Sequence, residues 1–477
     1  MRIAVVDKER CRPDKCDLVC IKFCPMVRTR REAIRLGDDG KAYVSELLCS
    51  GCGICVRKCP YDALRIVNLP DELESDHIHR YGPNQFTLYR LPVPRTDAVI
   101  GLLGRNAIGK STVLNILSGN LIPNLGNHGD PPTKEEIVER FSGHPLHDSM
   151  ENLYENGSKV SYKPQYVDQI PKVVKGKVGE VLESRDERGV IDELTDALEI
   201  GHLLDRELDV LSGGELQRVA IAAAISRDAE TYLLDEPSSH LDIYQRIRVA
   251  QVIRGLLADG KNVVVAEHDL AVLDYLSDDI FVLYGEPNVY GIVSNVHGVR
   301  EGINIYINGY IPDENVRFRD QPIIFHVKPP TSGTGRARPL IEWTELKKAY
   351  EEFSLTIEAG HIGVGEVVGI LGKNGIGKTT FVRILAGVES ADEGAVLAGD
   401  VKVSYKPQYL SGTIEGNVEE VLRRAAGEKY LEAWFSAEVI EPLHVRHMLE
   451  KEVDVLSGGE LQRVAIAECL SRDADIY

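Results

Sequence analysis

Short apolar runs, each followed by a glycine-rich loop and a helical pattern, are the most regular feature of the chain. The runs AVIGLL (98–103) and EVVGIL (366–371) have the length and composition of buried parallel strands. The stretches STVLNILSG (111–119) and TTFVRILAG (379–387) then show helical periodicity. Further strand patterns occur at TYLL (231–234) and VVVA (263–266). This alternation predicts α/β domains built on parallel sheets.

An internal repeat underlies this regularity. The string VSYKPQY occurs at residues 160–166 and again at 403–409, and DVLSGGELQRVAIA occurs at 209–222 and again at 454–467. The two pairs are offset by 243 and 245 residues, which is nearly the same spacing. One domain is therefore present twice in the chain.

Each copy contains a P-loop, G-x-x-x-x-G-K-[ST], between its first strand and the following helix. Backbone N–H groups of such a loop approach nucleotide phosphates, and its lysine reaches the β- and γ-phosphates. Ser111 and Thr379 would ligate Mg²⁺. The residues expected to bind nucleotide are Gly104, Asn106, Gly109, Lys110, Ser111 and Thr112 in the first copy, and Gly372, Asn374, Gly375, Gly377, Lys378, Thr379 and Thr380 in the second. Ala107 replaces the glycine found at position 375, which we expect to be tolerated if the position does not require a positive φ.

Two carboxylates follow the strand pattern at 231–234 in the first copy. Asp235 suits the Mg²⁺ shell and Glu236 can polarise the attacking water. The strand at 263–266 is followed by His268, which is placed to sense the γ-phosphate. A lone histidine is more often structural, but its position after a buried strand favours the functional interpretation.

Eight of the nine cysteines lie between Cys11 and Cys59. The set Cys49, Cys52, Cys55 and Cys59 before Pro60 has the spacing of a bacterial ferredoxin. The set Cys11, Cys16, Cys20 and Cys24 before Pro25 is less regular. Because the fourth cysteine of each run ligates the other cluster in two-cluster ferredoxins, we expect one 4Fe–4S cluster on Cys49, Cys52, Cys55 and Cys24, and a second on Cys11, Cys16, Cys20 and Cys59. Zinc sites and disulfides are the alternatives.

Composition limits the classes of partner. No apolar run reaches the roughly 18 to 20 residues of a membrane helix, and the first ten residues are too polar for a signal peptide. A cytoplasmic protein without a membrane partner is expected. The net charge of −19 argues against a general polyanion-binding surface, so no DNA partner is expected. Residues 26–35 nevertheless contain four arginines, which form either an RNA-facing patch or an ordinary solvated face.

The repeated LSGGELQ string resembles the signature of ATP-binding cassette proteins. The resemblance covers roughly residues 75–477 and implies two cassettes packed head to tail, with each ATP between one P-loop and the other copy's signature. It implies that the signatures Ser212, Gly213, Gly214 and Ser457, Gly458, Gly459 contact nucleotide, and that Gln165 and Gln408 lie near Mg²⁺ and the attacking water. Adenine requires an aromatic face, for which Tyr81 and Phe86 are the candidates, with Tyr350 or Phe353 in the second copy.

A soluble twin cassette fused to a ferredoxin-like domain resembles the ribosome-recycling ATPases, the RNase L inhibitor or E subfamily of cassette proteins. That resemblance implies a fold of a small α+β ferredoxin-like domain (1–72), a first cassette (73–284) with a helix–loop–helix insertion at about 121–158, a hinge (285–340) and a second cassette (341–477). PPTKEEIVERF is expected to begin a short helix of this insertion. The insertion would face the ribosome or be an idle surface segment. In the hinge, Arg317 and Arg319 are candidate phosphate contacts.

The same resemblance implies a function. Members split ribosomes into subunits after termination or rescue, and the iron–sulfur domain acts as a lever between the subunits. The implied partners are the small ribosomal subunit with its RNA and proteins, release factor 1 or a Pelota-like factor, and initiation factors in a further role. The expected enzyme is an ATPase with Mg²⁺ and two 4Fe–4S clusters, with Glu236, His268 and Gln165 as catalytic residues.

The sequence departs from the family in its second copy. LSRDADIY ends the chain where the first copy continues into its catalytic carboxylates. We therefore expect a second cassette that is truncated before its Walker B motif. Two alternative functions remain: an ATP-gated iron–sulfur redox protein, and a transporter ATPase, which the ferredoxin-like module disfavours.

Overall fold

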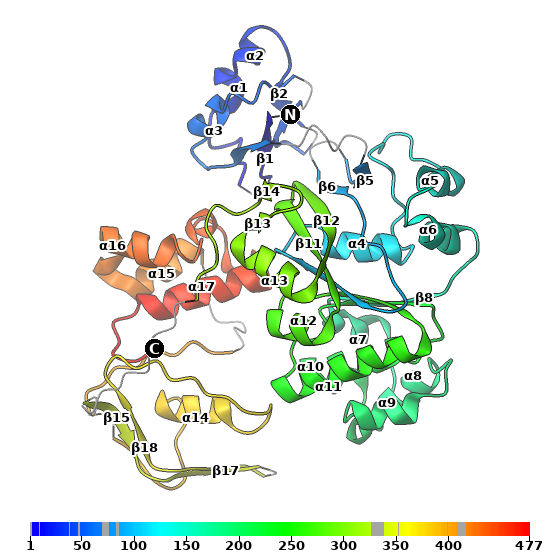
Figure 1. The fold of residues 1–477 in the computed structure, drawn as a ribbon. Coiled ribbons are helices and arrows are strands. Elements are labelled where there is room, and N and C mark those ends of the chain that lie inside the picture. The colour runs from blue at the N-terminus through cyan, green and yellow to red at the C-terminus, as the bar shows by residue number, and fades with distance from the viewer. Residues whose placement is uncertain are drawn as a thin grey trace. The chain divides into compact units, whose positions relative to one another are not determined.

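A computed structural model describes residues 2–8, 10–37, 39–45, 48–68, 76–82, 85–325, 338–351, 353–397, 399–408 and 416–477. The chain forms two units, Met1–His326 and Val327–Tyr477. The first unit contains the cysteine-rich region and the first copy of the repeat, and the second unit contains the second copy (Figure 1). Within the described part of the chain, no helix has both the length and the apolar character needed to cross a bilayer.

The cysteine-rich region is a small α+β fold. Strand β1 (Arg2–Val6) pairs antiparallel with β4 (Leu64–Asn68), and β2 (Ile34–Leu36) forms a hairpin with β3 (Ala42–Val44). Three short helices, α1 (Val19–Phe23), α2 (Pro25–Arg28) and α3 (Ile54–Lys58), accompany these strands. The buried residues of this region are mostly small side chains or cysteines. Burial of apolar surface therefore contributes little to the stability of this region. The expected boundary at residue 72 lies outside the described residues.

The first cassette is built on one eight-stranded sheet with the order β5-β6-β12-β11-β7-β10-β9-β8. The bounds are β5 (His77–Arg80), β6 (Thr87–Tyr89), β7 (Val99–Gly104), β8 (Val160–Lys163), β9 (Thr231–Asp235), β10 (Asn262–Ala266), β11 (Asp279–Glu286) and β12 (Tyr290–Gly298). Strand β7 leads into the P-loop and pairs in parallel with β10 and β11. The strands expected at 98–103, 231–234 and 263–266 are confirmed, and they place the P-loop at the centre of the sheet.

The strands of this sheet are buried on both faces. Along β7, Val99 belongs to one core, whereas Ile100 and Leu102 belong to the other. Successive side chains point to opposite faces of a strand, and both faces are covered here, so the sequence shows a continuous apolar run. Helices contributing to the first core are α8 (Val178–Glu183), α9 (Ile191–Ala197), α10 (Gly213–Ile225) and α11 (Ile243–Gly255), and those contributing to the second are α4 (Lys110–Leu117), α5 (Lys134–Arg140) and α6 (His147–Tyr154). Short helices α7 (Ile170–Val173) and α12 (Leu270–Leu276) complete the cassette before residue 299.

Helices α5 and α6 form a helix–loop–helix within residues 121–158. The helix expected after Thr133 is confirmed, and its start is a capping box. The Glu136 N–H donates to Thr133 Oγ1 at 3.3 Å, and the Thr133 N–H donates to Glu136 Oε2 at 2.8 Å. Ile137 and Phe141 pack into the cassette core, so this segment is fixed to the domain from which it projects.

The expected start of the hinge at residue 285 is wrong. Strand β12 (Tyr290–Gly298) pairs with β11 and β6, so the first cassette's sheet extends to residue 298. Helix α13 (Val299–Asn308) then packs on this sheet through Ile305, and β13 (Tyr310–Ile311) pairs with β14 (Val316–Arg317). Arg317 is exposed. Each arginine lies over an aromatic ring, Arg317 over Tyr310 at 5.3 Å from its centroid and Arg319 over Tyr306 at 4.9 Å. Arg319 also donates to the Ile307 carbonyl at 3.2 Å. The remainder of the hinge, 326–337, lies outside the described residues.

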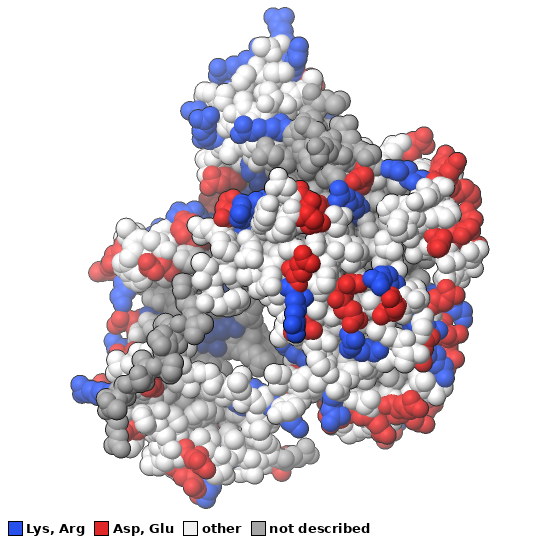
Figure 2. Space-filling view, viewed as in Figure 1, with Lys and Arg blue, Asp and Glu red and all other residues white. Residues whose placement is uncertain are grey.

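The cysteine-rich region contacts the turn between β11 and β12 of the cassette. Arg65 Nη1 forms an ion pair with Glu286 at 2.6 Å, and its Nη2 donates to the Pro287 carbonyl at 2.8 Å. Val5 and Val67 pack against Val289 beside these polar contacts. Figure 2 shows Lys and Arg side chains over the cysteine-rich region at the top of the view, whereas Asp and Glu gather over α5 and α6. The four arginines of residues 26–35 are all exposed.

The second unit contains fewer strands. Strand β15 (Pro339–Trp343) lies between β18 (Gly360–Gly363) and β19 (Val396–Leu397), and β16 (Leu346–Ala349) pairs with β17 (Ser354–Ile357). Helix α14 (Lys378–Leu385) follows the second P-loop. Helices α15 (Val418–Ala426), α16 (Ala433–Phe435) and α17 (Gly458–Ser471), with a π-helix at Ser436–Ile440, share a separate apolar core.

The strand expected at residues 366–371 is absent from the described second unit, so that expectation is wrong. Val367 and Leu371 are 99% and 95% exposed. In the first cassette the corresponding strand β7 is held between β10 and β11, which follow Asp235 along the chain. The 477 residues contain no second-copy counterpart of either strand. Without neighbours for its backbone N–H and C=O groups, an apolar run does not form a central strand.

Candidate functional site

The first P-loop turns directly from β7 into α4. Gly109 has a φ of 106°, and a Cβ atom there would lie 2.7 Å from Phe86, so both conformation and space require glycine. The Lys110 ammonium curls back along the loop, donating to the Gly104 and Arg105 carbonyls at 2.8 and 3.0 Å. Burial lowers the pKa of Lys110 to about 8, against the opposing effect of Glu236 and Asp235. The loop therefore holds a desolvated cation where phosphate oxygens would enter.

Ala107 adopts the left-handed conformation in this loop. Its φ is 59°, and its counterpart Gly375 has a φ of 77°. The condition under which we expected the alanine to be tolerated is therefore not met. The Asn288 N–H, from the β11–β12 turn, donates to the Ala107 carbonyl at 2.9 Å and helps to hold this conformation.

Ala107→Gly is expected to stabilise the first unit. Relief of left-handed strain contributes about 1–2 kcal/mol, and the greater backbone entropy of glycine in the unfolded chain offsets about 0.4–1 kcal/mol. The net gain of about 1 kcal/mol should raise the midpoint of that unit's thermal transition by about 2–4 °C. Gly375→Ala is the matched control and should lower the second unit's midpoint, because no atom lies within 4 Å of the added Cβ and only backbone strain changes. A lower midpoint for Ala107→Gly would contradict the strain argument.

Five predicted side chains meet beside the loop, three of them predicted to be catalytic (Gln165, Glu236 and His268) and two to bind Mg²⁺ (Ser111 and Asp235). Ser111 Oγ donates to Asp235 Oδ2 at 2.8 Å, where β9 ends. Gln165 Nε2 donates to Glu236 Oε1 at 2.6 Å, and His268 Nε2 lies 3.3 Å from the same oxygen. The hydrogen bond from His268 is the main reason that the pKa of Glu236 is lowered, whereas burial raises the pKa of Asp235. Glu236 is thus ionised and oriented, as a carboxylate that polarises water must be.

A cavity of about 500 Å³ joins these groups. Its lining includes eleven predicted residues: Tyr81, Phe86, Asn106, Gly109, Lys110, Ser111, Thr112, Gln165, Asp235, Glu236 and His268. Ala107, Tyr166 and Asn288 also line it and were not predicted to bind nucleotide. Asn288 follows from no sequence motif, because it reaches the loop only through the pairing of β11 with β12.

The two predicted aromatic residues occupy different positions. Tyr81 is 47% exposed at the mouth of the cavity, with its hydroxyl 3.3 Å from Thr112 Oγ1, and is free to present a ring face to adenine. Phe86 is packed beneath the P-loop against Gly109. The second copy repeats this arrangement, since Phe353 lies against Gly377 and Tyr350 is 45% exposed. Tyr350 and Phe353 thus correspond to Tyr81 and Phe86.

Both signature serines cap helices. Ser212 and Ser457 begin α10 and α17 in capping boxes with Glu215 and Glu460. Their hydroxyls donate to these carboxylates at 2.7 and 2.8 Å. In the first copy a Cβ on Gly214 would lie 2.9 Å from the His240 carbonyl. The segment at residues 238–242, here called the D-loop, therefore closely approaches the signature. Each signature, with Gly213 and Gly214 or Gly458 and Gly459, thus exposes the N-terminus of a helix more than three turns long, which favours phosphate.

In the second P-loop the lysine makes the same contacts as in the first, but the described second unit does not contain counterparts of all the residues that surround the first P-loop. Lys378 donates to the Gly372 and Lys373 carbonyls, both at 2.7 Å. Gln408 lies beside Gln462, whose Nε2 donates to the Gln408 carbonyl at 3.4 Å, and residues 409–415 are outside the described part. The Mg²⁺ roles of Thr379 and Gln408 therefore remain predictions, as do the nucleotide contacts of Asn374, Gly375, Gly377 and Thr380.

All nine cysteines are free thiols in the structure, and the first eight separate into two groups. The electrostatic neighbours of Cys20 are Cys16, Cys11 and Cys59, and those of Cys55 are Cys49, Cys52 and Cys24. These are the two cross-ligated sets expected from the ferredoxin spacing. Burial raises the pKa of Cys20 to about 11 and that of Cys55 to about 12, so binding of iron by the thiolates would release protons.

The cysteine groups offer the thiolates that 4Fe–4S clusters require. Among the residues that the structure describes, no three Cys, His, Asp or Glu side chains converge on one metal position. Backbone N–H groups also donate to these sulfurs: those of Ala4 and Gly51 to Cys49 Sγ, and that of Ala63 to Cys59 Sγ, each at 3.4 Å.

Comparison with known proteins gives the same division of the chain. An ABC transporter model matches residues 94–239 and 352–477, the Fer4-like domain of RNase L inhibitor matches 1–32, and a 4Fe-4S binding domain matches 42–65. The translation initiation factor RLI1 of Saccharomyces cerevisiae is 44% identical, over 100% of this chain and 79% of its own length. The chain belongs to the RNase L inhibitor family. It is therefore an ATPase of the ATP-binding cassette type with a 4Fe–4S binding region.

Two solved structures of RNase L inhibitor family members also match. A model of ribosome-bound archaeal Pelota and ABCE1 has a TM-score of 0.92 and 50% identity, covering 100% of this chain and 80% of the matched chain. A crystal structure of the archaeal ribosome recycling factor aABCE1 with the ribosomal stalk protein aP1 has a TM-score of 0.79 and 51% identity, covering 85% of this chain and 78% of the other. The α/β twin-cassette fold predicted from the sequence is confirmed.

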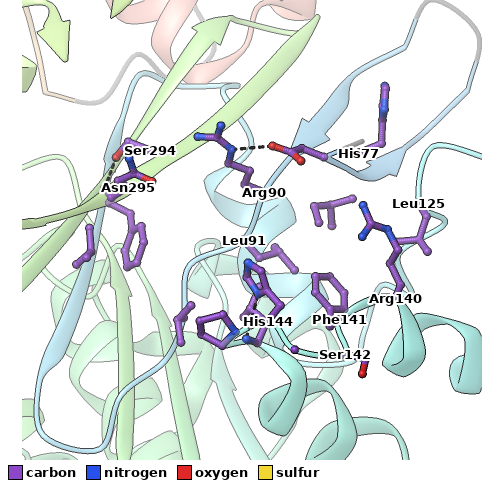
Figure 3. Close-up of a pocket in the computed structure, with 18 of the residues that line it drawn as sticks. His77, Arg90, Leu91, Leu125, Arg140, Phe141, Ser142, His144, Ser294 and Asn295 are labelled. Atoms are coloured by element: carbon purple, nitrogen blue, oxygen red, sulfur yellow. Dashed lines mark hydrogen bonds and ion pairs between the residues drawn. The ribbon is translucent and has the colours of Figure 1, made fainter. Parts of the chain in front are cut away.

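A second cavity of the first cassette, about 790 Å³, lies between the β5–β6 hairpin, the α5–α6 loop and the edge of β12 (Figure 3). It is larger than the P-loop cavity. Two of its three arginines have carboxylate partners: Arg90 donates to Asp76 and Glu314 at 3.0 and 3.2 Å, and Arg95 donates to Asp97 and Asp279. Leu91, Phe141 and His144 lie together on one side. The predicted nucleotide-binding residues line the smaller cavity and not this one.

Two buried charged residues near the catalytic carboxylates were missed by the sequence analysis. Lys163 is 1% exposed and Glu267 is 2% exposed. Burial lowers the pKa of Lys163 to about 8, while Asp235, Glu267 and Glu236 act in the opposite direction. Both positions carried a signal: Lys163 is a charged residue within a strand pattern that recurs as Lys406, and Glu267 ends an apolar strand directly before His268.

Proposed function

We propose that this chain is a cytoplasmic ribosome-recycling ATPase that splits ribosomes into subunits after termination or rescue. ATP-dependent closure of its twin cassettes swings the iron–sulfur domain against the ribosome. Its partners are the small subunit with its RNA and proteins, and release factor 1 or a Pelota-like factor, with initiation factors in a further role. The observation that carries the proposal is the likeness, over the whole chain, to the ABCE1 in a ribosome-bound complex with Pelota.

The domain plan follows the same likeness. The ferredoxin-like domain occupies about residues 1–72, the first cassette continues to residue 298, a hinge follows, and the second cassette begins near residue 341. ATP would occupy the first P-loop with its phosphates beside Lys110 and its adenine at Tyr81. Ser111, Asp235 and Gln165 would hold Mg²⁺, and their hydroxyl, carboxylate and amide oxygens suit this hard cation. Thr379 and Gln408 would do so in the second cassette.

Hydrolysis at the first P-loop would use Glu236 to polarise water, with His268 and Gln165 holding its carboxylate. When ATP is bound, its phosphates supply the negative charge that the P-loop and a signature helix both attract. Loss of the γ-phosphate removes part of that charge, so binding and hydrolysis alternately favour closed and open cassettes. The β11–β12 turn contacts both the P-loop at Ala107 and the iron–sulfur domain at Arg65. This turn would transmit cassette movement to that domain.

Two 4Fe–4S clusters are proposed on the two cysteine groups, and they would stiffen a domain whose own core is small. Protein prepared without oxygen should contain about eight iron atoms per chain. Iron and zinc would be measured together by plasma mass spectrometry. Cys469→Ser, which changes the isolated ninth cysteine, should leave the iron content unchanged. Tightly bound zinc in place of iron would contradict the cluster assignment.

Sucrose-gradient sedimentation of ribosomes would test the recycling proposal. Ribosomes programmed with a stop codon would be incubated with the protein, ATP and release factor 1, or with a Pelota-like factor when stalled. Free subunits should appear only when both ATP and the factor are present. Intact ribosomes in every combination, with protein that hydrolyses ATP, would contradict the proposal. An ATP-gated redox protein would instead reduce an acceptor in an ATP-dependent manner and leave ribosomes intact.

A further inference from the structure

The backbone of Glu236 is held in an unusual conformation at the end of β9. Its φ is 47°, a left-handed value that costs a non-glycine residue about 1–3 kcal/mol and persists only where surrounding contacts impose it. The Glu236 N–H donates to the Ala266 carbonyl of β10 at 2.9 Å. This contact fixes one side of the peptide, and the conformation turns the side chain into the P-loop cavity, where Gln165 and His268 contact its carboxylate.

Lys163 fixes the other side of this turn. Its ammonium, at the end of β8, donates to the Asp235 carbonyl at 2.9 Å and to the Glu236 carbonyl at 3.3 Å. Gln217 of α10 is fully buried and donates to the same Glu236 carbonyl at 2.7 Å. Two donors from different elements thus converge on one carbonyl. Lys163 contacts backbone only, so it leaves both catalytic carboxylates free for their own partners.

Glu267 provides the complementary charge. Its Oε1 accepts the Ser238 N–H of the D-loop at 2.8 Å, and its Oε2 accepts the His268 N–H at 3.0 Å. The buried Glu267 carboxylate therefore links Ser238 of the D-loop to His268, whose ring contacts Glu236. Lys163 and Glu267 thus hold neighbouring parts of one structure, because Lys163 contacts the Asp235 and Glu236 carbonyls and Glu267 contacts the N–H groups of Ser238 and His268.

We propose that Lys163 and Glu267 are a buried pair of positioning residues for ATP hydrolysis at the first P-loop. Lys163 holds the backbone turn at Asp235 and Glu236, and Glu267 holds the backbone of Ser238 and His268 next to that turn. Neither residue touches nucleotide. The proposal rests on hydrolysis by Glu236 and is independent of ribosome splitting.

Lys406 repeats Lys163 in the second copy, and its ammonium contacts the side chain of Gln462, the counterpart of Gln217.

The test compares Lys163→Met, Glu267→Gln and the double variant with Glu236→Gln as reference. Misplacement of a catalytic group by about 1 Å costs on the order of 10²-fold in rate. We therefore expect Lys163→Met to lower kcat for ATP by about 10²-fold with little change in the affinity for a fluorescent ATP analogue. In the Glu236→Gln background, Lys163→Met should lower kcat no further, because the Glu236 carboxylate that Lys163 positions is already absent.

Stability separates positioning from a purely structural role. Lys163→Met removes a buried cation close to three carboxylates, those of Asp235, Glu267 and Glu236, so the thermal midpoint should fall. The double variant Lys163→Met/Glu267→Gln removes both charges and should recover most of that midpoint. Its kcat should nevertheless stay at least 10-fold below that of the unchanged protein, and Lys163→Arg, which retains a donor, should recover part of the rate. A double variant that hydrolyses ATP at the normal rate, or an additive loss in the Glu236→Gln background, would overturn the proposal.

Discussion

Glu236→Gln is expected to bind ATP with unchanged affinity and to hydrolyse it at the first P-loop about 10²–10³-fold more slowly. The carboxylate is partly buried, ionised and held by Gln165, Ser239 and His268, so its negative charge is available to a water molecule. The amide has nearly the same shape but cannot accept a proton or polarise water to the same degree. ATP binding depends on the P-loop, which this change leaves intact. Single-turnover hydrolysis of radiolabelled ATP, with binding measured separately, tests the prediction.

Glu230→Gln provides the matched control for this change. Glu230 directly precedes β9, the strand that Asp235 ends, and it is exposed at the opposite end of the strand. The same change of charge there should leave hydrolysis within about twofold. Because ATP would remain bound without being cleaved, Glu236→Gln should accumulate the ATP-bound state. Normal single-turnover cleavage in Glu236→Gln would show that another group polarises the water.

The sequence predicted which residues would come together beside the first P-loop, because these residues follow short local patterns. A P-loop, a strand ending in two carboxylates and a strand followed by histidine each specify a position relative to a strand end. Parallel strands bring those ends to one edge of the sheet, as they do for Ser111, Asp235 and Glu236. The two cysteine groups were predictable for a similar reason, because the ferredoxin spacing indicates which cysteines lie near one another.

The missed features depend on contacts between distant segments. The positive φ at Ala107 follows from the shape of the loop and not from the residue, since alanine disfavours it. Asn288 reaches the P-loop through β11–β12 pairing, and Glu267 meets Ser238 across neighbouring strand ends. The apolar run at 366–371 shows that a local pattern alone is not sufficient to form a strand. Its composition is that of a buried strand, but a strand also needs neighbours, and local patterns cannot supply them.

Cys24→Ser is expected to abolish ribosome splitting while basal ATPase activity changes little. Cys24 ends α1 but belongs electrostatically with Cys49, Cys52 and Cys55, so its thiolate would join the two halves of the domain through one cluster. Its removal should lower the iron content from about eight to about four atoms per chain. The P-loop, Asp235 and Glu236 are contributed by the cassette, so the nucleotide site should assemble without that cluster. Iron analysis, ATPase rate and subunit sedimentation on one preparation measure the three effects.

The cassette contacts the iron–sulfur domain at Arg65, Glu286 and Val289, and we expect force on the ribosome to be transmitted through this contact. A domain that lacks one cluster would deform under this load, so hydrolysis would continue without splitting. Cys469→Ser is the matched control and should retain both activities, because that buried cysteine lies in the second unit. A lever also predicts that unchanged protein splits ribosomes at equal rates when oxidised and when reduced with dithionite. A strong dependence on reduction would mean that the clusters deliver electrons to a reaction, and the lever interpretation would then be wrong.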